Sequence, residues 1–467
     1  MGISSYKPAT FCRSPTLTPR RCVMLRSPSL VLPVSLFGFL FLLTATSCHA
    51  QVERAGGNAT ATQLTATSSD DWPCFRGPSH MGTSPSEDIP TSWSATENLL
   101  WKTSLPGSGA SSPITFGDHI YLTSYTGFLV PGQSGGSQED LKRHVLALDR
   151  ASGQIVWQKE IPAKLPEEDN IRDHGFAANT CAADEQGVIA FLGKSGVFAF
   201  DHEGNPQWQA DVGSKTHGWG TASSPLLYDD LVIINASIEN ESLVALDRQT
   251  GKPRWQAGGI REAWNTPIIV TAESGRKEVV VARHGDVMAF DPATGDPLWT
   301  CKTDISWYMV PTGVAADGVV YFLGGRSGTA ALAVKAGGSG DVTQTHRLWT
   351  SKAGTNVPSP ILHEGHLYYI DYNGSIAYCT EAKSGEVVYQ QRLNRFDQVY
   401  ASPVMAAGKI VYLARNGEAL VIEAKPQYEE ISRNTLKDGT RFDASPAIDG
   451  NRLLIRSGDT LYCVGNR

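Results

Sequence analysis

Short runs in which apolar and polar residues alternate, each ended by a glycine-containing turn, recur along most of the chain. Residues 244–247 (Val-Ala-Leu-Asp) form one such run, and Gly251 and Trp255 follow it. Alternation with a period of two predicts a strand with one buried face. The Asp side chain can bond the amides of the turn, and the glycine can take the positive φ that the turn needs. We therefore expect an all-β protein built of strand–turn–strand units.

The aromatic residue four positions after the turn glycine recurs with the unit. It starts the next predicted strand and can dock against a neighbouring sheet, so the motif both turns the chain and holds adjacent units together. Copies occur at residues 147–157, 289–299, 199–208 (one residue shorter in the turn) and 381–389 (with Tyr389 as the aromatic residue). The tryptophans predicted to be structural docking residues are Trp101, Trp157, Trp208, Trp255, Trp299 and Trp349.

A second pattern, a Ser-Pro pair or a variant of it, precedes another set of apolar runs. From Pro225 onward the prolines are 42, 44, 49, 43 and 43 residues apart. A proline at the first position of a strand is tolerated because its missing N–H costs least there. The copies are Ser112-Pro113, Ser224-Pro225, Thr266-Pro267, Val310-Pro311, Ser359-Pro360, Ser402-Pro403 and Ser445-Pro446, with Cys181-Ala182 as a degenerate eighth.

Together the two patterns predict units of four antiparallel strands, A to D. Strand A follows the Ser-Pro pair, B is a second apolar run, C ends at the turn Asp, and D carries the aromatic residue. Four strands at a period near 43 residues are typical of a propeller blade. Eight A strands and eight C strands predict an eight-bladed β-propeller. Because the last C strand lacks its own D strand, we expect residues 99–105 to fill that place and close the ring.

Composition narrows the classes of function. The formal net charge is −7 and no basic tract stands out, which argues against a nucleic-acid partner. The cysteines beyond residue 50 are widely spaced, without a CxxC or an adjacent pair, so zinc, haem c and a vicinal disulfide are not predicted. We expect no metal site and interpret these cysteines as small buried side chains, two of which can form one bridge. They are Cys74, Cys181, Cys301, Cys379 and Cys463.

Residues 1–50 have the organisation of a signal peptide. Arg20, Arg21 and Arg26 precede an apolar run over residues 30–43, and small and polar residues follow as far as Ala50. The run is short for a membrane span, so we expect no transmembrane span after cleavage. Residues 51–69, rich in Ala, Thr, Ser and Gly, predict a disordered spacer. We expect an exported protein, periplasmic or extracellular, whose propeller occupies residues 70–467.

Two features of the leader leave alternatives open. Met24 as well as Met1 can be the true start, and Met24 would leave a signal of ordinary length. Cys48 can be a lipidation site after cleavage, although Ala45 stands where lipoprotein signals prefer Leu. Simple secretion is the favoured interpretation, and membrane anchorage through Cys48 is the alternative.

The docking motif Ala-x-Asp-x-x-Thr-Gly-x-x-x-Trp resembles that of pyrroloquinoline-quinone (PQQ) repeat propellers. That group includes quinoprotein alcohol dehydrogenases and the propeller lipoprotein of the outer-membrane assembly machinery. The opening Trp72-Pro73-Cys74-Phe75-Arg76-Gly77-Pro78 is similar to that of secreted planctomycete members of the superfamily. The resemblance covers about residues 70–467 and implies the fold. It implies less about function, because the motif is a packing device shared by enzymes and non-enzymes.

Two classes of function follow from the resemblance. The dehydrogenases carry a disulfide between adjacent cysteines over the quinone, and they hold calcium through Glu and Asn beside an Asp base. Such a set cannot be placed on this sequence, whose length is closer to that of the assembly lipoprotein. We therefore expect a binding or scaffold protein for a protein, peptide or glycan partner, with no cofactor and no catalytic residue. The alternative is a PQQ-dependent oxidoreductase with an atypical site, which would require PQQ and calcium.

Strand order predicts where a ligand would bind. Because the strands alternate in direction, the D-to-A and B-to-C connections lie on one face of the disc, around the central channel. Insertions at residues 128–142 and 159–179 should rise above this face as a partial lid. The candidate residues on this face are Arg172, His174, His217, Trp219, Trp264, Asn265, Arg326, Asn356, Tyr400, Arg415 and Asp443.

A basic residue also recurs in five of the B-to-C turns. One interpretation is a basic, aromatic-lined mouth for an anionic ligand or peptide, in which Arg326 and Arg415 converge on an anion. The other is that these residues pair with carboxylates between blades. His174 and His217 are the histidines that we would test for chemistry. The basic turn residues are Lys194, Arg283, Arg326, Arg415 and Arg456.

Overall fold

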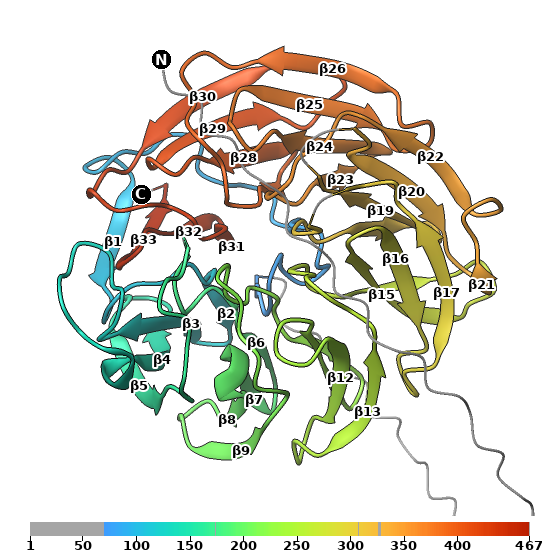
Figure 1. Cartoon of the computed structure of the whole chain (residues 1–467). Helices are drawn as coiled ribbons and strands as arrows, with labels where there is room; N and C mark the ends of the chain where they lie inside the picture. The colour runs from blue at the N-terminus through green and yellow to red at the C-terminus, as the bar shows by residue number, and fades with distance from the viewer. Residues whose placement is uncertain (1–69, 173, 307, 326–327, 467) are drawn as a thin grey trace, which may run out of the picture. The chain divides into compact units, whose positions relative to one another are not determined.

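The structure is a computed structural model that describes residues 70–466, apart from 173, 307, 326 and 327. The predicted signal peptide (1–50) and spacer (51–69) lie outside the described residues. The described residues lie in one compact unit, and their strands make eight sheets arranged as a ring (Figure 1). The predicted all-β, eight-bladed propeller is confirmed. No helix in the described part of the chain has the length and apolar character to cross a membrane.

Blades 1 to 4 follow one another along the chain from the first inner strand. Blade 1 comprises β2 (Ile114–Phe116), β3 (His119–Thr126), β4 (Lys142–Asp149) and β5 (Ile155–Pro162). Blade 2 comprises β6 (Ala182–Asp184), β7 (Gly187–Phe191), β8 (Val197–Phe200) and β9 (Pro206–Ala210). Blade 3 comprises β10 (Leu226–Tyr228), β11 (Leu231–Ala236), β12 (Ser242–Asp247) and β13 (Pro253–Gly258). Blade 4 comprises β14 (Ile268–Thr271), β15 (Lys277–Arg283), β16 (Asp286–Phe290), β17 (Pro297–Lys302) and the added β21 (Gly340–Asp341).

Blades 5 to 8 complete the ring. Blade 5 comprises β18 (Val314–Ala316), β19 (Val319–Leu323), β20 (Ala331–Lys335) and β22 (Arg347–Ser351). Blade 6 comprises β23 (Ile361–His363), β24 (His366–Ile370), β25 (Ile376–Glu381) and β26 (Val387–Arg392). Blade 7 comprises β27 (Val404–Ala406), β28 (Lys409–Leu413), β29 (Glu418–Glu423) and β30 (Glu430–Thr435). Blade 8 comprises β31 (Ala447–Asp449), β32 (Arg452–Arg456), β33 (Thr460–Gly465) and β1 (Leu99–Ser104). Two short 3-10 helices in the described residues are η1 (Gln138–Asp140) and η2 (Gly193–Ser195).

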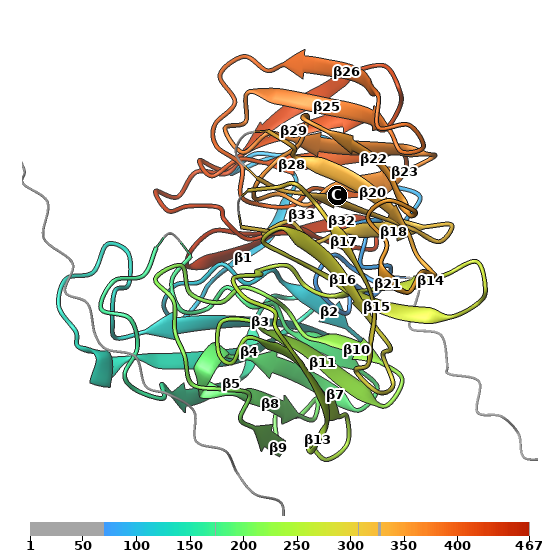
Figure 2. The same ribbon diagram turned by 45° about the vertical axis from the view of Figure 1, so that its right-hand side comes forward.

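Blade 3 shows how the residue pattern produces these strands. The middle strands β11 and β12 are almost entirely buried, whereas the outer strand β13 alternates between exposed and buried positions. Outer strands such as β13 and β26 accordingly lie at the periphery of the ring (Figures 1 and 2). In the turn after β12, the amide of Thr250 donates to the Asp247 carboxylate at 2.9 Å, and Gly251 has a φ of +68°. The Asp and the Gly of the repeat therefore build the turn as the sequence predicts.

In five blades the tryptophan of the outer strand lies over the turn glycine of the next blade. A Cβ atom at Gly251 would lie 2.4 Å from an indole carbon of Trp208, so only glycine leaves room for that ring. The Trp208 indole N–H also donates to the carbonyl oxygen of Arg248 at 2.9 Å. Ring contact and hydrogen bond together couple adjacent blades. The same N–H contact joins Trp157 to His202, Trp255 to Pro292 and Trp349 to Ala382.

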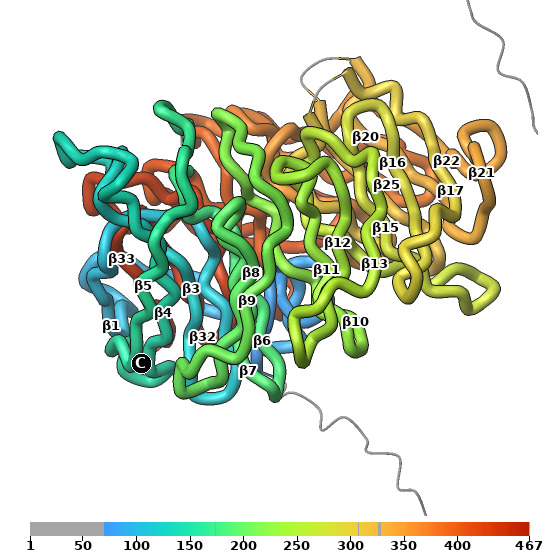
Figure 3. Tube along the Cα trace, turned by 60° about the horizontal axis from the view of Figure 1, so that its bottom comes forward, coloured from blue at the N-terminus to red at the C-terminus, as the bar shows by residue number. Residues whose placement is uncertain are grey.

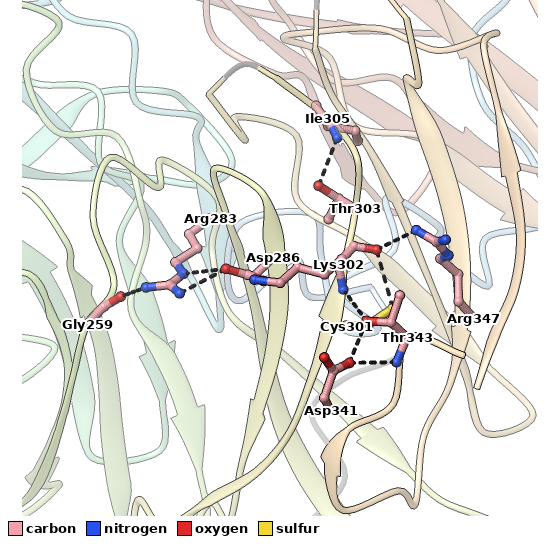
Figure 4. A network of polar contacts seen from close by, with 10 residues as sticks. All are labelled: Gly259, Arg283, Asp286, Cys301, Lys302, Thr303, Ile305, Asp341, Thr343 and Arg347. Carbon is pink, nitrogen blue, oxygen red and sulfur yellow. Dashed lines mark hydrogen bonds and ion pairs between the residues drawn. The ribbon is translucent and has the colours of Figure 1, made fainter. Parts of the chain in front are cut away.

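Trp299 departs from this arrangement. Its indole N–H donates to the Glu278 carboxylate at 2.6 Å, and β21 pairs in parallel with β17 beside it. Figure 4 shows how this insertion is tied down: the amide of Lys302 donates to Thr343, whose hydroxyl donates to Asp341. The Trp299 indole thus bonds a carboxylate beside an inserted strand, whereas the five other outer-strand tryptophans lie over a turn glycine.

The two ends of the described chain meet in blade 8. β1 pairs antiparallel with β33, and Trp101 lies opposite Cys463 in the register. The expectation that residues 99–105 close the ring is confirmed. Burial of Leu461 and Val464 behind β1 leaves no free edge on β33.

A closed ring of hydrogen bonds surrounds the axis where the inner strands begin. In each blade, the residue two positions before the inner strand is Ser or Thr, and its main-chain N–H donates to the hydroxyl oxygen of the equivalent residue in the next blade, at 2.9 to 3.2 Å. We call this set the hydroxyl ring. Its members are Ser112, Thr180, Ser224, Thr266, Thr312, Ser359, Ser402 and Ser445.

The hydroxyl ring corrects the predicted register of two repeats. Thr180-Cys181 takes the place that we assigned to Cys181-Ala182, and Thr312-Gly313 takes the place that we assigned to Val310-Pro311. The residue pair used as the marker was therefore out of register in these two blades. What every blade keeps is a hydroxyl that can accept the hydrogen bond from its neighbour.

The first described residues, 71–98, cross the ring before the chain enters β1. Trp72 exchanges hydrogen bonds with Thr115 of blade 1, and the carbonyl of Pro73 accepts from Ala183 of blade 2. On the other side, Gly82 accepts from Met405 of blade 7. The blue trace of this segment passes through the middle of the ring in Figure 1 and lies beside β6 in Figure 3. These contacts involve the inner strands themselves rather than the D-to-A connections, so the segment spans the opposite end of the channel.

Candidate ligand-binding cavity

A cavity of about 280 Å³ lies on the axis of the propeller. All eight D-to-A connections contribute to its wall, and Phe75 from the segment 71–98 contributes as well. Because that segment spans the opposite end of the channel, the cavity is a blind pocket that opens toward the D-to-A face. Its lining residues are Phe75, Ala110, Ser112, Arg172, His174, Ala178, Thr180, Trp219, Ala222, Trp264, Tyr308, Val310, Thr312, Asn356, Val357, Ser359, Tyr372, Tyr400, Ser402, Asp443 and Ser445.

Most of the predicted site residues meet in this cavity. Those that line it are Arg172, His174, Trp219, Trp264, Asn356, Tyr400 and Asp443. Arg172 and His174 come from the insertion at residues 159–179, which therefore forms part of the wall. Arg326 lies outside the described residues, and the remaining three predicted residues are placed elsewhere.

The aromatic wall is fixed by its own contacts. The Trp264 indole N–H donates to the carbonyl oxygen of Gly220 at 2.9 Å, and the ring meets Tyr308 edge-on at a centroid distance of 5.0 Å. On another side, Tyr372 and Tyr400 lie 5.5 Å apart. Rings held in this way present apolar faces with little further loss of side-chain entropy on binding.

Asp443 and Arg415 form an ion pair at the edge of the cavity. Two guanidinium nitrogens of Arg415 donate to the two carboxylate oxygens of Asp443, at 2.6 and 3.0 Å, and the guanidinium lies 3.8 Å from the centre of the Tyr400 ring. Burial raises the pKa of Asp443, and the positive charge of Arg415 opposes that shift. The charges of the pair cancel, so Asp443 does not make the cavity acidic.

Arg172 is the exposed cation of the cavity mouth. Its guanidinium lies 4.6 Å from the centre of the Trp219 ring, and its main-chain N–H donates to Gly218 at 3.1 Å. Stacking on an indole orients the guanidinium and leaves the N–H groups at its edge available for an incoming acceptor. Trp219 is half-buried beneath it.

Asn265 and His217 do not line the cavity. The Asn265 amide is fully buried and donates to the carbonyls of Ala282 and Met309 at 2.6 and 2.9 Å, so it ties its own connection to β15 of blade 4 and to the connection between blades 4 and 5. The His217 ring packs behind the wall, with its centroid 5.2 Å from that of Trp264. Both residues lie in D-to-A connections, but the Asn265 side chain bonds main-chain carbonyls and the His217 ring packs against Trp264.

The recurring basic residues contact groups within the propeller. Arg283 binds the Asp286 carboxylate and the carbonyl of Gly259, as Figure 4 shows. Lys194 donates to the carbonyl of Pro166. The buried Arg456 donates to main-chain carbonyls, and desolvation lowers its pKa to about 9. For these three residues the interpretation as a basic mouth is therefore wrong, and Arg415 is the one described member of the set that lies beside the cavity.

Three kinds of cavity-lining residue were not among the predicted site residues. Phe75 could not be placed because its segment crosses the ring from outside the repeats. Tyr372 follows strand β24, in a B-to-C connection where only basic residues had been considered. The hydroxyl ring could have been predicted from the Ser or Thr at matched positions before each inner strand. The repeats were aligned on the neighbouring proline instead.

The residues of the cavity do not fit a calcium–quinone site. Asp443 is the only carboxylate among the described lining residues, and Arg415 already binds both of its oxygens. Across the described residues, no group of three or more His, Cys, Asp or Glu side chains is placed to hold a metal ion. Cys74, Cys181, Cys301, Cys379 and Cys463 are buried and free.

These features define the protein as an eight-bladed propeller with a blind, aromatic-walled axial cavity. The family model for outer membrane protein assembly factor BamB matches residues 141–391, and the chain belongs to this family. Outer membrane protein assembly factor BamB of Yersinia pestis is 26% identical over 389 residues, which cover 78% of this chain and 87% of the relative.

Solved structures agree with the fold. BamB from Moraxella catarrhalis superposes with a TM-score of 0.55 at 16% identity, covering 79% of this chain and 97% of that one. Quinohemoprotein alcohol dehydrogenase from Comamonas testosteroni superposes with a TM-score of 0.60 at 11% identity, covering 85% and 81%. At these identities the likeness establishes the shared propeller alone.

Proposed function

We propose that this chain is an exported scaffold protein that binds a protein partner at the open face of its cavity. The family is named after an outer membrane protein assembly factor, and two relatives have the same name. Applied to this chain, that name supports a place in the periplasm, at the outer membrane. The predicted signal peptide at residues 1–50 agrees with export, and Cys48 is the candidate site for a lipid anchor.

The observation that carries the proposal is the pairing of Arg172 with Trp219 at the cavity mouth. Trp, Tyr and Arg are the residues most enriched at the energetic centres of protein interfaces. Here an oriented guanidinium lies on an indole, 4.6 Å from its centre, with Trp264, Tyr308 and Tyr400 in the same cavity. This composition favours a protein or peptide over a glycan as the partner.

The alternative, a quinone-dependent oxidoreductase, is not favoured. Its support is the fold likeness to a quinohemoprotein alcohol dehydrogenase, which does not extend to function at 11% identity. The cavity also lacks, among its described residues, a carboxylate that is available for calcium.

Charge reversal on the two faces of the disc tests the proposal. Arg172→Glu alters the open face, and Lys252→Glu makes the same change at an exposed turn on the opposite face. The full-length tagged chain and both variants are cross-linked in cells, purified, and compared for co-purifying proteins. We expect one partner that is retained with Lys252→Glu and lost with Arg172→Glu at unchanged melting temperature. A partner retained or lost equally by both variants would contradict the proposal.

A further inference from the structure

The hydroxyl ring has a hydrogen-bonding capacity that the protein does not use. Each of its eight hydroxyl oxygens accepts one main-chain N–H. Within the described residues, none of these hydroxyls donates a hydrogen bond to a protein acceptor. All eight residues are at least nine-tenths buried. A buried O–H without an acceptor is costly, so its partner has to enter from solvent or with a ligand.

Six members of the ring line the cavity, and we call them the cavity hydroxyls. They are Ser112, Thr180, Thr312, Ser359, Ser402 and Ser445. Their donors surround the axis of one blind pocket, so an acceptor inside it can receive several hydrogen bonds. Donation from a hydroxyl is strongest to an anionic oxygen.

The charges of the pocket also favour an anion. Arg172 contributes a positive charge at the mouth, whereas the charge of Asp443 is cancelled by Arg415. Trp264 and Tyr308 present flat apolar surfaces in the same pocket as the cavity hydroxyls. The wall therefore matches a ligand that carries a negative oxygen group on a flat apolar body.

From this arrangement we propose that the axial cavity is a binding site for a carboxylate attached to a flat apolar group. The carboxylate accepts hydrogen bonds from cavity hydroxyls, with Arg172 as the attracting cation, and the apolar group packs on the aromatic wall. The same chemistry is present in a free aromatic carboxylate and in an acidic side chain next to an aromatic one in a partner segment. If the carboxylate belongs to a partner segment, this cavity is where the proposed protein partner binds. Binding of a free carboxylate does not depend on the proposed function.

Calorimetric titration with sodium benzoate, and with benzamide as its neutral isostere, tests the site. We expect saturable benzoate binding that is at least tenfold tighter than benzamide binding. A second pair of probes, acetyl-Gly-Glu-Trp-Gly-amide and its Gln counterpart, separates the two sources. Preference for the Glu peptide over benzoate assigns the carboxylate to a partner segment, and preference for benzoate assigns it to a small molecule. If neither benzoate nor the Glu peptide binds better than its neutral counterpart, the proposal is overturned.

The hydroxyl ring supplies a matched control. Thr312→Val removes a hydroxyl that lines the cavity, whereas Thr266→Val removes an equivalent ring hydroxyl that does not. Each variant deletes one acceptor of the ring, so both should lower the melting temperature by similar amounts. Only Thr312→Val should weaken binding of the anionic probe, by about fivefold or more. Equal weakening by both variants would show that the ring acts through stability alone and would contradict the proposal. Loss of the co-purifying partner tests the proposed function separately, because that measurement requires no probe.

Discussion

The main-chain N–H of Ser445 donates a hydrogen bond to the hydroxyl oxygen of Ser112 at 3.1 Å, although 333 residues separate the two along the chain. This bond is the last of eight that circle the axis, and it joins blade 8 to blade 1. At the rim, β1 pairs with β33 and closes the same blade from outside. The ring is thus closed at its inner and outer radius by contacts between the two ends of the propeller.

Closure at the rim predicts the effect of a deletion. Removing residues 99–104 (β1) should expose the edge of β33, which is apolar from Leu461 to Val464, and should promote aggregation. Light scattering after size-exclusion chromatography measures the outcome. Deletion of residues 131–136, an exposed part of an insertion, is the control and should leave a monomer. A monomeric β1 deletion with an unchanged melting curve would contradict the closure.

The docking of outer tryptophans predicts a loss of stability on truncation. Trp255 is 9% exposed and donates to the carbonyl of Pro292. Trp255→Ala should lower the free energy of unfolding by about 3–5 kcal/mol, the usual range for a large core side chain. Trp255→Phe keeps an aromatic ring and should cost less. Urea unfolding measures both, and equal stability of Trp255→Ala and the unaltered chain would refute the docking role.

The turn glycines predict a second stability effect. Gly251→Ala forces a Cβ atom to within 2.4 Å of the Trp208 ring at a φ of +68°, so it should destabilise the contact between blades 2 and 3. Gly258→Ala, in β13 of blade 3, places its Cβ in open space and is the control. Differential scanning calorimetry should show a clear drop in melting temperature for Gly251→Ala alone. A larger drop for Gly258→Ala would mean that the glycine is not needed for ring contact.

Glu239 predicts a pH dependence of stability. Burial raises the pKa of this carboxyl from its ordinary 4.5 to about 8, although Arg143 opposes the shift. The native state therefore keeps a proton that the unfolded chain releases, so the free energy of unfolding falls as pH rises from 4.5 to 8. The slope contributed by one group is about 1.4 kcal/mol per pH unit. Glu239→Gln should flatten this dependence and stabilise the protein at pH 8.

The groups around Glu239 define its control. Arg143 and Glu167 form a buried ion pair at 2.7 Å beside it, and Thr221 donates to its carboxyl. Glu203→Gln, which changes an exposed carboxyl, should leave the pH profile of the melting temperature as it is. A Glu239→Gln profile parallel to that of the unaltered chain would show that Glu239 is ionised in the native state.

The sequence predicts the fold well because the signals are local. Asp247, Gly251 and Trp255 lie within a single turn and its flanking strands, and each performs its part through neighbours in sequence or in the next blade. Ring closure by residues 99–105 could be deduced as well, since one C strand lacked a partner.

The sequence predicts which connections lie around the site but not which of their side chains line the cavity. The repeat pattern places Trp264 and Asn265 side by side in one D-to-A loop, yet Trp264 lines the cavity and Asn265 bonds carbonyls of blade 4 and of the connection that follows it. Which side chain turns inward depends on packing across blades, and no local pattern records it. The position of Phe75 depends on a segment that crosses the ring, so it is beyond any repeat-based argument.

Photocross-linking from two positions tests directly whether the open cavity face binds a protein partner. A photoreactive phenylalanine derivative replaces Trp219 at the cavity mouth or Leu348, which is 50% exposed on the outer strand β22. The full-length chain is irradiated in cells, and adducts are resolved by mass. We expect a discrete protein adduct from position 219 and none from position 348. An adduct from position 348 with none from position 219 would place the partner on the rim and contradict binding at the open cavity face.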